Sequence, residues 1–308
     1  MLSRPSPFFL SGCPVSRSLP LTHILLATAI TAVWGTNFVV MRIGLNHFPP
    51  LLFAALRFVF VFLPAAFFLK RPKVPILQLV AYGLLVGAGQ FGILYFAISG
   101  HITPGLASLI VQTQVFFTIG LAILIEGDKV KAAQWLALVL AVAGIVVIGL
   151  HSERGTTLLG IVMVLAAAAS WAGSNAVARR AGPVNHLAYV VWSALFSFPP
   201  LFLVSWIFEG WPTMSDAVMT ASPAIWLTVL WQSVGNTLFG YTAWVWLLSR
   251  YQPATIAPMS LLVPVFGMSA SSLLLGEPLP GWKVLAAGLV MGGLALNMLW
   301  PRFVRTDA

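Results

Sequence analysis

The chain has 308 residues, of which 59% are hydrophobic and only 7% are charged, and its formal net charge is +9. A soluble globular domain is excluded, because so few charged side chains cannot give it a polar surface. Nucleic-acid binding is not expected, since the sixteen Lys and Arg residues are scattered between apolar runs. The lone cysteine, Cys13, allows no intramolecular disulfide or thiolate cluster. The composition therefore indicates a chain whose main solvent is the lipid bilayer.

Residues 1–22 form an N-terminal tail with four prolines, which we predict to be disordered. Its apolar triplet, Phe8-Phe9-Leu10, is too short for the hydrophobic region of a signal peptide. We expect the first apolar segment, which starts at Ile24, to act as an uncleaved insertion signal instead.

The rest of the chain contains ten apolar stretches long enough to cross a bilayer, whose core of ~30 Å needs about 20 helical residues. They lie at about 24–45, 51–69, 76–100, 104–125, 132–150, 158–178, 187–208, 223–248, 254–275 and 281–300. Stretches this long exclude the roughly ten-residue strands of a membrane barrel. The sequence therefore predicts an all-α integral membrane protein with ten transmembrane helices.

The basic residues predict how the chain is threaded. With the N-terminus inside, twelve of the sixteen Lys and Arg residues lie on the cytoplasmic side, three lie on the opposite side, and Arg57 lies within a helix. Cytoplasmic loops carry such an excess of basic residues. We therefore expect an inner-membrane protein with both termini in the cytoplasm, including a C-terminal tail at 301–308.

The two halves of the chain resemble one another. The clearest matches, at an offset of 149 residues, are Pro104 with Pro253, Asp128 with Glu277 and Gly144 with Gly293. We divide the chain into a first five-helix repeat at 23–150 and a second at 157–300. Because five crossings are an odd number, the second repeat is inserted upside down. Inverted repeats around a site at the membrane midplane are a recurring plan of secondary transporters.

Four stretches, at 34–58, 69–75, 105–122 and 257–279, begin with WGTNFVV, LKRPKVP, GLASLIVQTQ and APMSLLVPV. They look like the EamA family of the drug/metabolite transporter superfamily, and the resemblance covers the chain from Ile24 onward. It is strongest to the O-acetylserine/cysteine exporter branch, whose members share Gln112-x-Gln114 and Trp192-Ser193-Ala194. The resemblance implies ten helices, an inner-membrane location and efflux of amino acids or related metabolites.

Polar side chains within the predicted helices indicate where a translocation path would run, since they are costly in hydrocarbon unless they face a partner or water. Trp34 and Asn37 share a face of the first helix, and Trp171 and Asn175 share a face of the sixth. Interhelical amide bonds would explain each pair as packing. Because the pair occurs in both halves, we favour a substrate-binding cavity.

Further neutral side chains complete the predicted substrate-binding set, namely Gln90, Gln112, Gln114, Asn236 and Tyr241. Gln112 and Gln114 are two residues apart, and on an α-helix such residues point about 200° from each other. We therefore expect one of them to line a narrow path and the other to pack against a neighbouring helix.

Arg57 is the only formal charge well inside a predicted segment, and we include it in the predicted substrate-binding set. Its guanidinium is suited to attract or orient the carboxylate of an amino-acid substrate. The alternative is an arginine that snorkels to the outer interface, or binds carbonyls there, and anchors the helix. The sequence leaves both interpretations open.

Proline and glycine residues indicate where helices break or pack closely. Pro258 and Pro264 are predicted to interrupt the ninth helix, so that freed carbonyls line the path, as in other carriers. The alternative is an inert kink. Gly288 and Gly292 form a small-xxx-small pair that permits close helix packing in the tenth segment.

No catalytic residue, cofactor or metal site is expected. The five histidines lie at loops or helix ends, without the spacing of metal ligands. No Asp or Glu lies deep in a predicted helix, so the sequence leaves the energy source open between facilitated diffusion and antiport.

The sequence thus predicts an alternating-access exporter of a small zwitterionic metabolite, with cysteine or O-acetylserine as the substrates that the resemblance implies. A carrier of drugs or nucleotide sugars is an alternative within the same class. An integral-membrane enzyme acting on lipid-linked substrates would need clustered His, Asp or Glu at one membrane face. The expected partners are a small-molecule substrate and the lipid bilayer, and a homodimer is left open.

Overall fold

The computed structural model describes residues 20–126, 132–151, 155–182, 184–251 and 256–303. These residues are almost entirely helical and contain no β-strand, which confirms the predicted all-α class. Nearly all of the predicted N-terminal tail, Asp128 and residues 304–308 of the predicted C-terminal tail lie outside the described residues.

The first half of the chain consists of long helices, two of which change helix type along their length. Its elements are α1 (Leu21–Leu45), α2 (Pro50–Ala66), α3 (Ile76–Leu84), η1 (Leu85–Gly92), α4 (Ile93–Gly100), α5 (Pro104–Ile110), η2 (Val111–Thr113), α6 (Gln114–Glu126) and α7 (Ala132–Leu150). Of these, η1 is a π-helix that joins α3 to α4, and η2 is a 3₁₀ turn that joins α5 to α6.

The second half repeats this pattern with shorter pieces. Its elements are α8 (Leu158–Arg179), α9 (His186–Ala194), α10 (Phe198–Phe208), α11 (Trp211–Thr220), α12 (Pro223–Leu230), η3 (Trp231–Phe239), α13 (Gly240–Arg250), η4 (Ala257–Leu261), α15 (Leu262–Leu275) and α16 (Gly281–Phe303). Here η3 is a second π-helix, between α12 and α13, and η4 is a 3₁₀ helix that precedes α15.

Local sequence explains several helix boundaries. Pro50, Pro104 and Pro223 lie in the first turn of α2, α5 and α12, where a missing N–H costs no intrahelical hydrogen bond. Gly276 ends α15 in the left-handed conformation, with a φ of 68° that suits a residue without a Cβ.

Length and hydropathy identify fewer spans than the ten predicted. Within the described ranges, eight helical stretches are long and apolar enough to cross a membrane. A ninth counts only if Trp211–Thr220 and Pro223–Leu247 form one span, and these are bent by 106°. α2 is apolar but short, because it ends at Ala66. The chain is therefore a multi-pass membrane protein, and ten crossings do not follow from the count alone.

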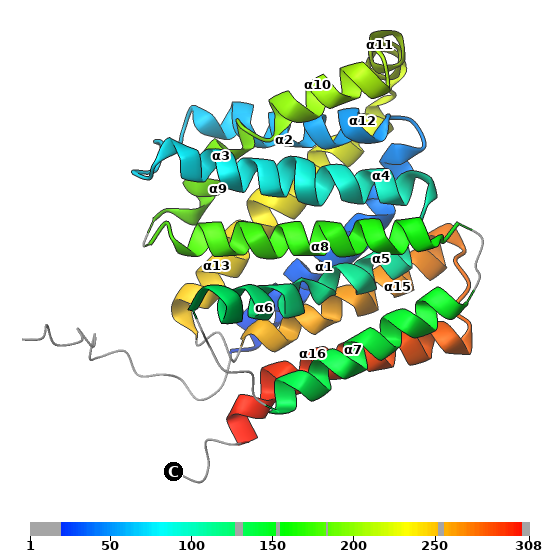
Figure 1. Cartoon of the computed structure of the whole chain (residues 1–308). Coiled ribbons are helices and arrows are strands. Elements are labelled where there is room, and N and C mark those ends of the chain that lie inside the picture. The colour runs from blue at the N-terminus through cyan, green and yellow to red at the C-terminus, as the bar shows by residue number, and fades with distance from the viewer. Residues whose placement is uncertain (1–19, 127–131, 152–154, 183, 252–255, 304–308) are drawn as a thin grey trace, which may run out of the picture.

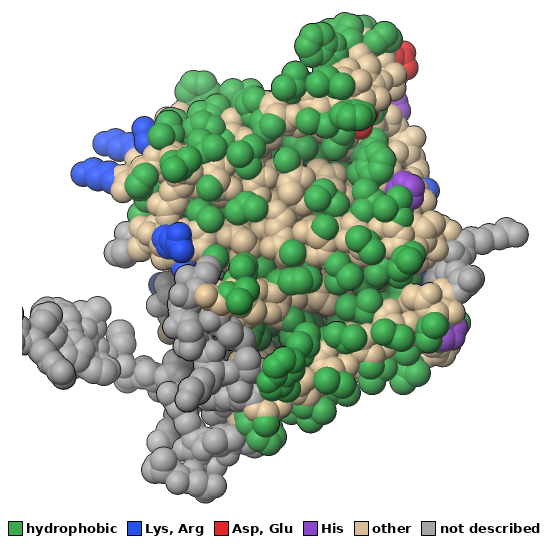
Figure 2. Space-filling view, in the orientation of Figure 1, with side chains coloured by type: hydrophobic (Ala, Val, Ile, Leu, Met, Phe, Trp, Pro, Cys, Tyr) green, Lys and Arg blue, Asp and Glu red, His purple; other side chains and the backbone are tan. Residues whose placement is uncertain are grey.

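The helices run side by side in one bundle, and α1 begins at the same end of the bundle at which α16 finishes (Figure 1). Most of the visible Lys and Arg side chains gather at this end, whereas Asp and Glu side chains lie toward the opposite end (Figure 2). Hydrophobic side chains cover the surface between the two ends, as expected of a surface in contact with lipid.

α7 and α16 pack along each other at one edge of the bundle (Figure 1). Their close contact uses the glycines that match between the two halves. A Cβ on Gly144 would lie 2.9 Å from the Ala286 carbonyl oxygen, and one on Gly293 would lie 2.5 Å from that of Ala137. The prediction that Gly288 and Gly292 provide close packing is wrong, because both face open space within the described part of the chain.

Candidate functional site

A cavity of about 440 Å³ lies among helices from both halves of the chain. Nine of the ten predicted substrate-binding residues line it, namely Trp34, Asn37, Gln90, Gln112, Gln114, Trp171, Asn175, Asn236 and Tyr241. The described lining residues are neutral polar, aromatic and aliphatic, and none is charged. The structure thus brings these residues together, while their part in substrate binding remains a prediction.

The indole of Trp34 is fixed against the opposite wall of the cavity. Its Nε1 donates a hydrogen bond to the Asn236 carbonyl oxygen at 3.2 Å. The ring packs on Tyr241 and Trp244, with centroids 5.8 and 5.2 Å away. Gly240 makes this contact possible, because a Cβ there would overlap the indole. A residue of the first half is therefore held by η3 and α13 of the second.

Both glutamines of the Gln112-x-Gln114 pair line the cavity, so the expectation that only one of them does is wrong. Gln112 Nε2 donates to the Ser260 carbonyl oxygen at 3.2 Å, and Gln114 Oε1 accepts from Asn175 Nδ2 at 3.3 Å. The physical reason is η2, because a 3₁₀ turn between the two residues changes the angle that a continuous α-helix would impose.

Two amide oxygens in the cavity wall have no hydrogen-bond partner among the described residues. They are Asn37 Oδ1 and Gln90 Oε1, on side chains that are each 3% exposed. Buried polar atoms in proteins nearly always have a partner. The cavity wall therefore carries two amide oxygens whose capacity to accept a hydrogen bond is unused among the described residues.

The two π-helices lie at equivalent places in the two halves. Gln90 follows Gly89 in η1, and Asn236 follows Gly235 in η3, at an offset of 146 residues. Both amides line the cavity. π-helical segments are rare and occur frequently at functional sites. The sequence pattern did not reveal them, because an apolar helix of either kind has the same composition.

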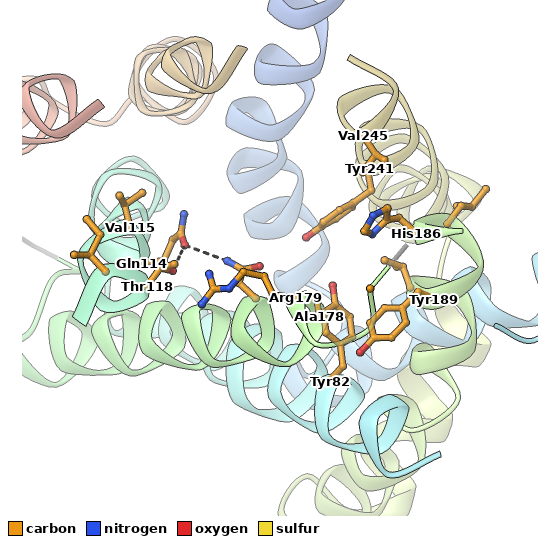
Figure 3. A pocket seen from close by; sticks show the side chains of 15 residues that line it. Tyr82, Gln114, Val115, Thr118, Ala178, Arg179, His186, Tyr189, Tyr241 and Val245 are labelled. Atoms are coloured by element: carbon orange, nitrogen blue, oxygen red, sulfur yellow. Dashed lines mark hydrogen bonds between the residues drawn. The ribbon is translucent and has the colours of Figure 1, made fainter. Parts of the chain in front are cut away.

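A second cavity, of about 700 Å³, continues the first, since Gln114, Val115, Asn175 and Tyr241 line both. Figure 3 shows Gln114 bonded to Thr118 on one side of this space, with tyrosines on the other. Gln114 also accepts a hydrogen bond from Asn175. The lining set also includes Arg179 at the end of α8 and His186 at the start of α9. The path therefore opens at the end of the bundle where the basic side chains gather.

Sequence reasoning missed Arg179 and His186 as part of this mouth. Both were assigned to loops or helix ends, which is where they lie. The missing information was the arrangement in space, because the mouth joins α3, α6, α8, α9 and α13, which are far apart in the sequence.

Toward the opposite end the cavity is closed by buried aromatic side chains. Phe91 and Tyr95 follow one another along η1 and α4, with ring centroids 6.3 Å apart. Tyr95 packs edge to face on Phe53 at 5.0 Å, and Phe53 stacks on Phe48 at 5.6 Å. We call Phe48, Phe53, Phe91 and Tyr95 the aromatic plug. All four are less than 9% exposed, so these rings are packed against their neighbours and away from solvent.

Two polar contacts hold the helices together at the closed end. Arg42, in the last turn of α1, donates from Nη1 to the carbonyl oxygens of Ile98 and Ser99, in the last turn of α4. Glu209, after α10, accepts from the backbone N–H groups of Leu51 and Leu52 at 2.7 and 3.1 Å. Its carboxylate therefore caps α2, whose first N–H groups have no intrahelical partner.

Arg57 lies behind the cavity wall and lines neither cavity. Its side chain is fully buried, and it donates to Gln232 Oε1 at 3.1 Å and to Thr237 Oγ1 at 2.9 Å. This burial contradicts the alternative of an arginine that snorkels to the interface. The ring of Phe91 covers the guanidinium, whose carbon lies 3.7 Å from the ring centroid. Direct contact with a substrate carboxylate thus stays a prediction, and it is not available in this conformation.

The two prolines of the ninth predicted helix behave differently from each other. Pro258 lies in η4, where the Ser260 carbonyl oxygen accepts from Gln112. Pro264 lies in the first turn of α15, which continues through it. Because Pro264 has no N–H, it cannot donate to the Ser260 carbonyl oxygen four residues earlier, which is the one that accepts from Gln112. The helix type changes from η4 to α15 two residues before Pro264, and a gating role for the two prolines stays a prediction.

The described ranges contain no group of three or more His, Cys, Asp or Glu side chains that could hold a metal ion.

The sequence profile of the EamA-like transporter family matches residues 21–150 and again 158–299. The chain belongs to this family. A relative from Salmonella typhimurium, a probable amino-acid metabolite efflux pump, is 39% identical over 91% of this chain and 96% of its own. An uncharacterized inner membrane transporter of Escherichia coli is 28% identical over 91% of each chain. A solved crystal structure shares the fold, with a TM-score of 0.62 at 17% identity, over 92% of this chain and 99% of the other.

Proposed function

We propose that this protein exports small amino acids or their derivatives, such as cysteine and O-acetylserine, across the inner membrane by alternating access. The observation that carries the proposal is the cavity, which has a neutral, hydrogen-bonding wall and continues into a second cavity at the basic end of the bundle. A volume of about 440 Å³ suits a small solute. The name of the Salmonella typhimurium relative, an amino-acid metabolite efflux pump, supports the substrate class.

The architecture we propose is ten transmembrane helices in two inverted five-helix repeats. The two stretches that match the family profile support the repeat. So does the packing, because two contacts have counterparts in the other half: α1 packs on α15 as α8 packs on α6, and η3 contacts α1 as η1 contacts α8. In this assignment α2 is a short span, and α12, η3 and α13 together form the eighth.

The open end is proposed to face the cytoplasm. Lys and Arg gather at that end, and cytoplasmic surfaces of membrane proteins carry the excess of basic residues. Both termini are then cytoplasmic, since α1 begins and α16 ends there. The conformation would be the inward-facing one, in which an exporter loads its solute.

Recognition would use neutral groups. The unpaired oxygens of Asn37 and Gln90 would accept hydrogen bonds from the ammonium group of an amino acid, and the aromatic rings of Trp34 and Trp171 would pack on its side chain. With no fixed charge in the described wall, no strong ion pair would have to break on release.

Uptake into inside-out membrane vesicles tests the proposal. Vesicles with the protein should accumulate labelled cysteine and O-acetylserine faster than vesicles without it, and the same uptake with and without a pH gradient would show whether protons drive it. Unrelated amino acids serve as the specificity control. If no amino acid is transported, the proposed substrate class is wrong.

A further inference from the structure

Arg57 is a buried positive charge that the described part of the chain holds with neutral groups only. Its hydrogen-bond partners are Gln232 and Thr237, and its guanidinium lies over Phe91 and, at 5.7 Å, near Phe58. No carboxylate is among the described partners of Arg57, and its Nε atom has no hydrogen-bond partner among the described residues. Amides, hydroxyls and aromatic faces stabilise a guanidinium without cancelling its charge.

This charge lies directly behind the cavity wall. One face of the Phe91 ring contacts the guanidinium, and Phe91 is itself a lining residue. On the other flank, Gln232, which accepts from Arg57, donates to the Asn37 carbonyl oxygen at 3.5 Å. Only one layer of side chains therefore separates the charge from the solute space.

The field of such a charge is weakly screened. At an effective dielectric constant of about 20 and a separation of about 8 Å, a unit charge changes the occupancy by a monovalent solute on the order of tenfold or more. Arg179, at the mouth, is exposed, so counter-ions screen its field. No Asp or Glu occurs among the described residues that line either cavity to oppose these positive charges.

We propose that Arg57 is a specificity-determining residue that excludes cationic solutes from the cavity and favours solutes that carry a carboxylate. It acts through the Phe91 ring, without touching the solute in the inward-facing conformation. This inference rests on the proposed function in treating the cavity as the site of transport. It narrows the substrate class to zwitterions and anions and excludes cationic amino acids and cationic drugs.

Charged thiol reagents test the electrostatic field of Arg57 in the cavity without requiring a substrate. In a Cys13→Ser background, which has no other cysteine, Leu94→Cys and Val115→Cys each place a thiol in the cavity wall. Labelling rates are measured with a sulfonatoethyl and a trimethylammonioethyl methanethiosulfonate, each normalised to a free thiol. The anionic reagent should react faster than the cationic one at both positions.

Three variants assign this preference to the charge at position 57. Arg57→Met should lower the anion-to-cation ratio about tenfold or more. Arg57→Lys, which keeps the charge, should preserve most of the preference for the anionic reagent. Gln232→Glu keeps the hydrogen bond to Arg57 and adds a counter-charge beside it, so it should lower the ratio like Arg57→Met. If Arg57→Met does not fold, Gln232→Glu decides, because it retains the arginine.

A cysteine at Val245, which lines only the second cavity, is the matched control. Its reagent preference should fall with added salt or with Arg179→Gln, and should change little in Arg57→Met. An unchanged ratio at positions 94 and 115 in folded Gln232→Glu protein would overturn the proposal. The failures are distinguishable: vesicles that take up no amino acid would refute the proposed function, whereas the labelling ratio would still test Arg57.

Discussion

The cavity and the closed end beside it use similar side chains in opposite ways. In the cavity, the side-chain oxygens of Asn37 and Gln90 lack partners among the described residues. At the closed end, the ring centroid of Phe53 lies 5.6 Å from that of Phe48 and 5.0 Å from that of Tyr95. The same helices, α1 and η1–α4, contribute to both regions.

This difference indicates at which end of the bundle separating the helices would cost free energy. Separating the helices at the closed end exposes packed aromatic surface and breaks the contacts of Arg42 and Glu209. In the cavity, Asn37 Oδ1 and Gln90 Oε1 have no hydrogen bond among the described residues to lose in the same movement. We therefore expect substitutions in the plug to change stability and opening, and substitutions in the cavity to change transport.

The largest expected effect is on the plug. Phe53→Ala removes a ring that is fully buried between Phe48 and Tyr95, and the void should destabilise the protein by about 3 kcal/mol. Denaturation in detergent measures the loss. Phe67→Ala is the control, because that ring is 84% exposed and its loss should leave stability nearly unchanged. Equal effects of the two substitutions would show that the plug is not a packed core.

The next largest effect should be confined to the cavity. Gly240→Ala places a methyl group against the Trp34 indole, with the ring atom Cε2 at 3.2 Å and Nε1 closer still, so the indole must move into the cavity. We expect transport to fall on the order of tenfold with insertion intact. Gly235→Ala is the matched control in η3, because its nearest contact would be an ordinary 3.5 Å. Equal loss in both variants would contradict a role for Trp34 placement.

Much of the cavity could be predicted, because one physical rule governs it. Polar groups are costly in hydrocarbon, so Asn37, Gln90 and Asn175 must gather where there are partners or water. That rule requires no knowledge of which helices are neighbours. It placed nine residues, and the structure collects them around one space.

The rest depended on helix geometry and on contacts between distant segments. The 3₁₀ turn at η2 turned Gln112 and Gln114 toward the same cavity, and apolar composition does not encode such a turn. Arg57 is held by side chains from η3, about 175 residues away in the sequence. α11 was not expected, because its ten residues are too few and too polar to be read as a span.

A smaller effect is expected from substituting either of two asparagines in the cavity. Asn37→Ala removes an unpaired acceptor, whereas Asn175→Ala removes the bond to Gln114, and each should reduce transport about fivefold through weaker solute binding. KM and maximal rate measured in vesicles would show this as a raised KM. Asn46→Ala, at an exposed residue after α1, should transport normally. Normal transport by both cavity variants would contradict the paired polar faces.

The smallest expected effect concerns the polar contact at the closed end. Glu209→Gln removes the charge that caps α2 and leaves an amide that can accept only in part, at a cost of about 0.5–1 kcal/mol. Weakening this contact should favour opening at that end. A cysteine placed at Phe48 in the Cys13→Ser background should then react severalfold faster with a membrane-impermeant thiol reagent added from outside. Asp216→Asn removes an exposed acid on α11 and should leave that rate unchanged. An equal rate in the two variants would show that the carboxylate of Glu209 caps α2 without holding the closed end shut.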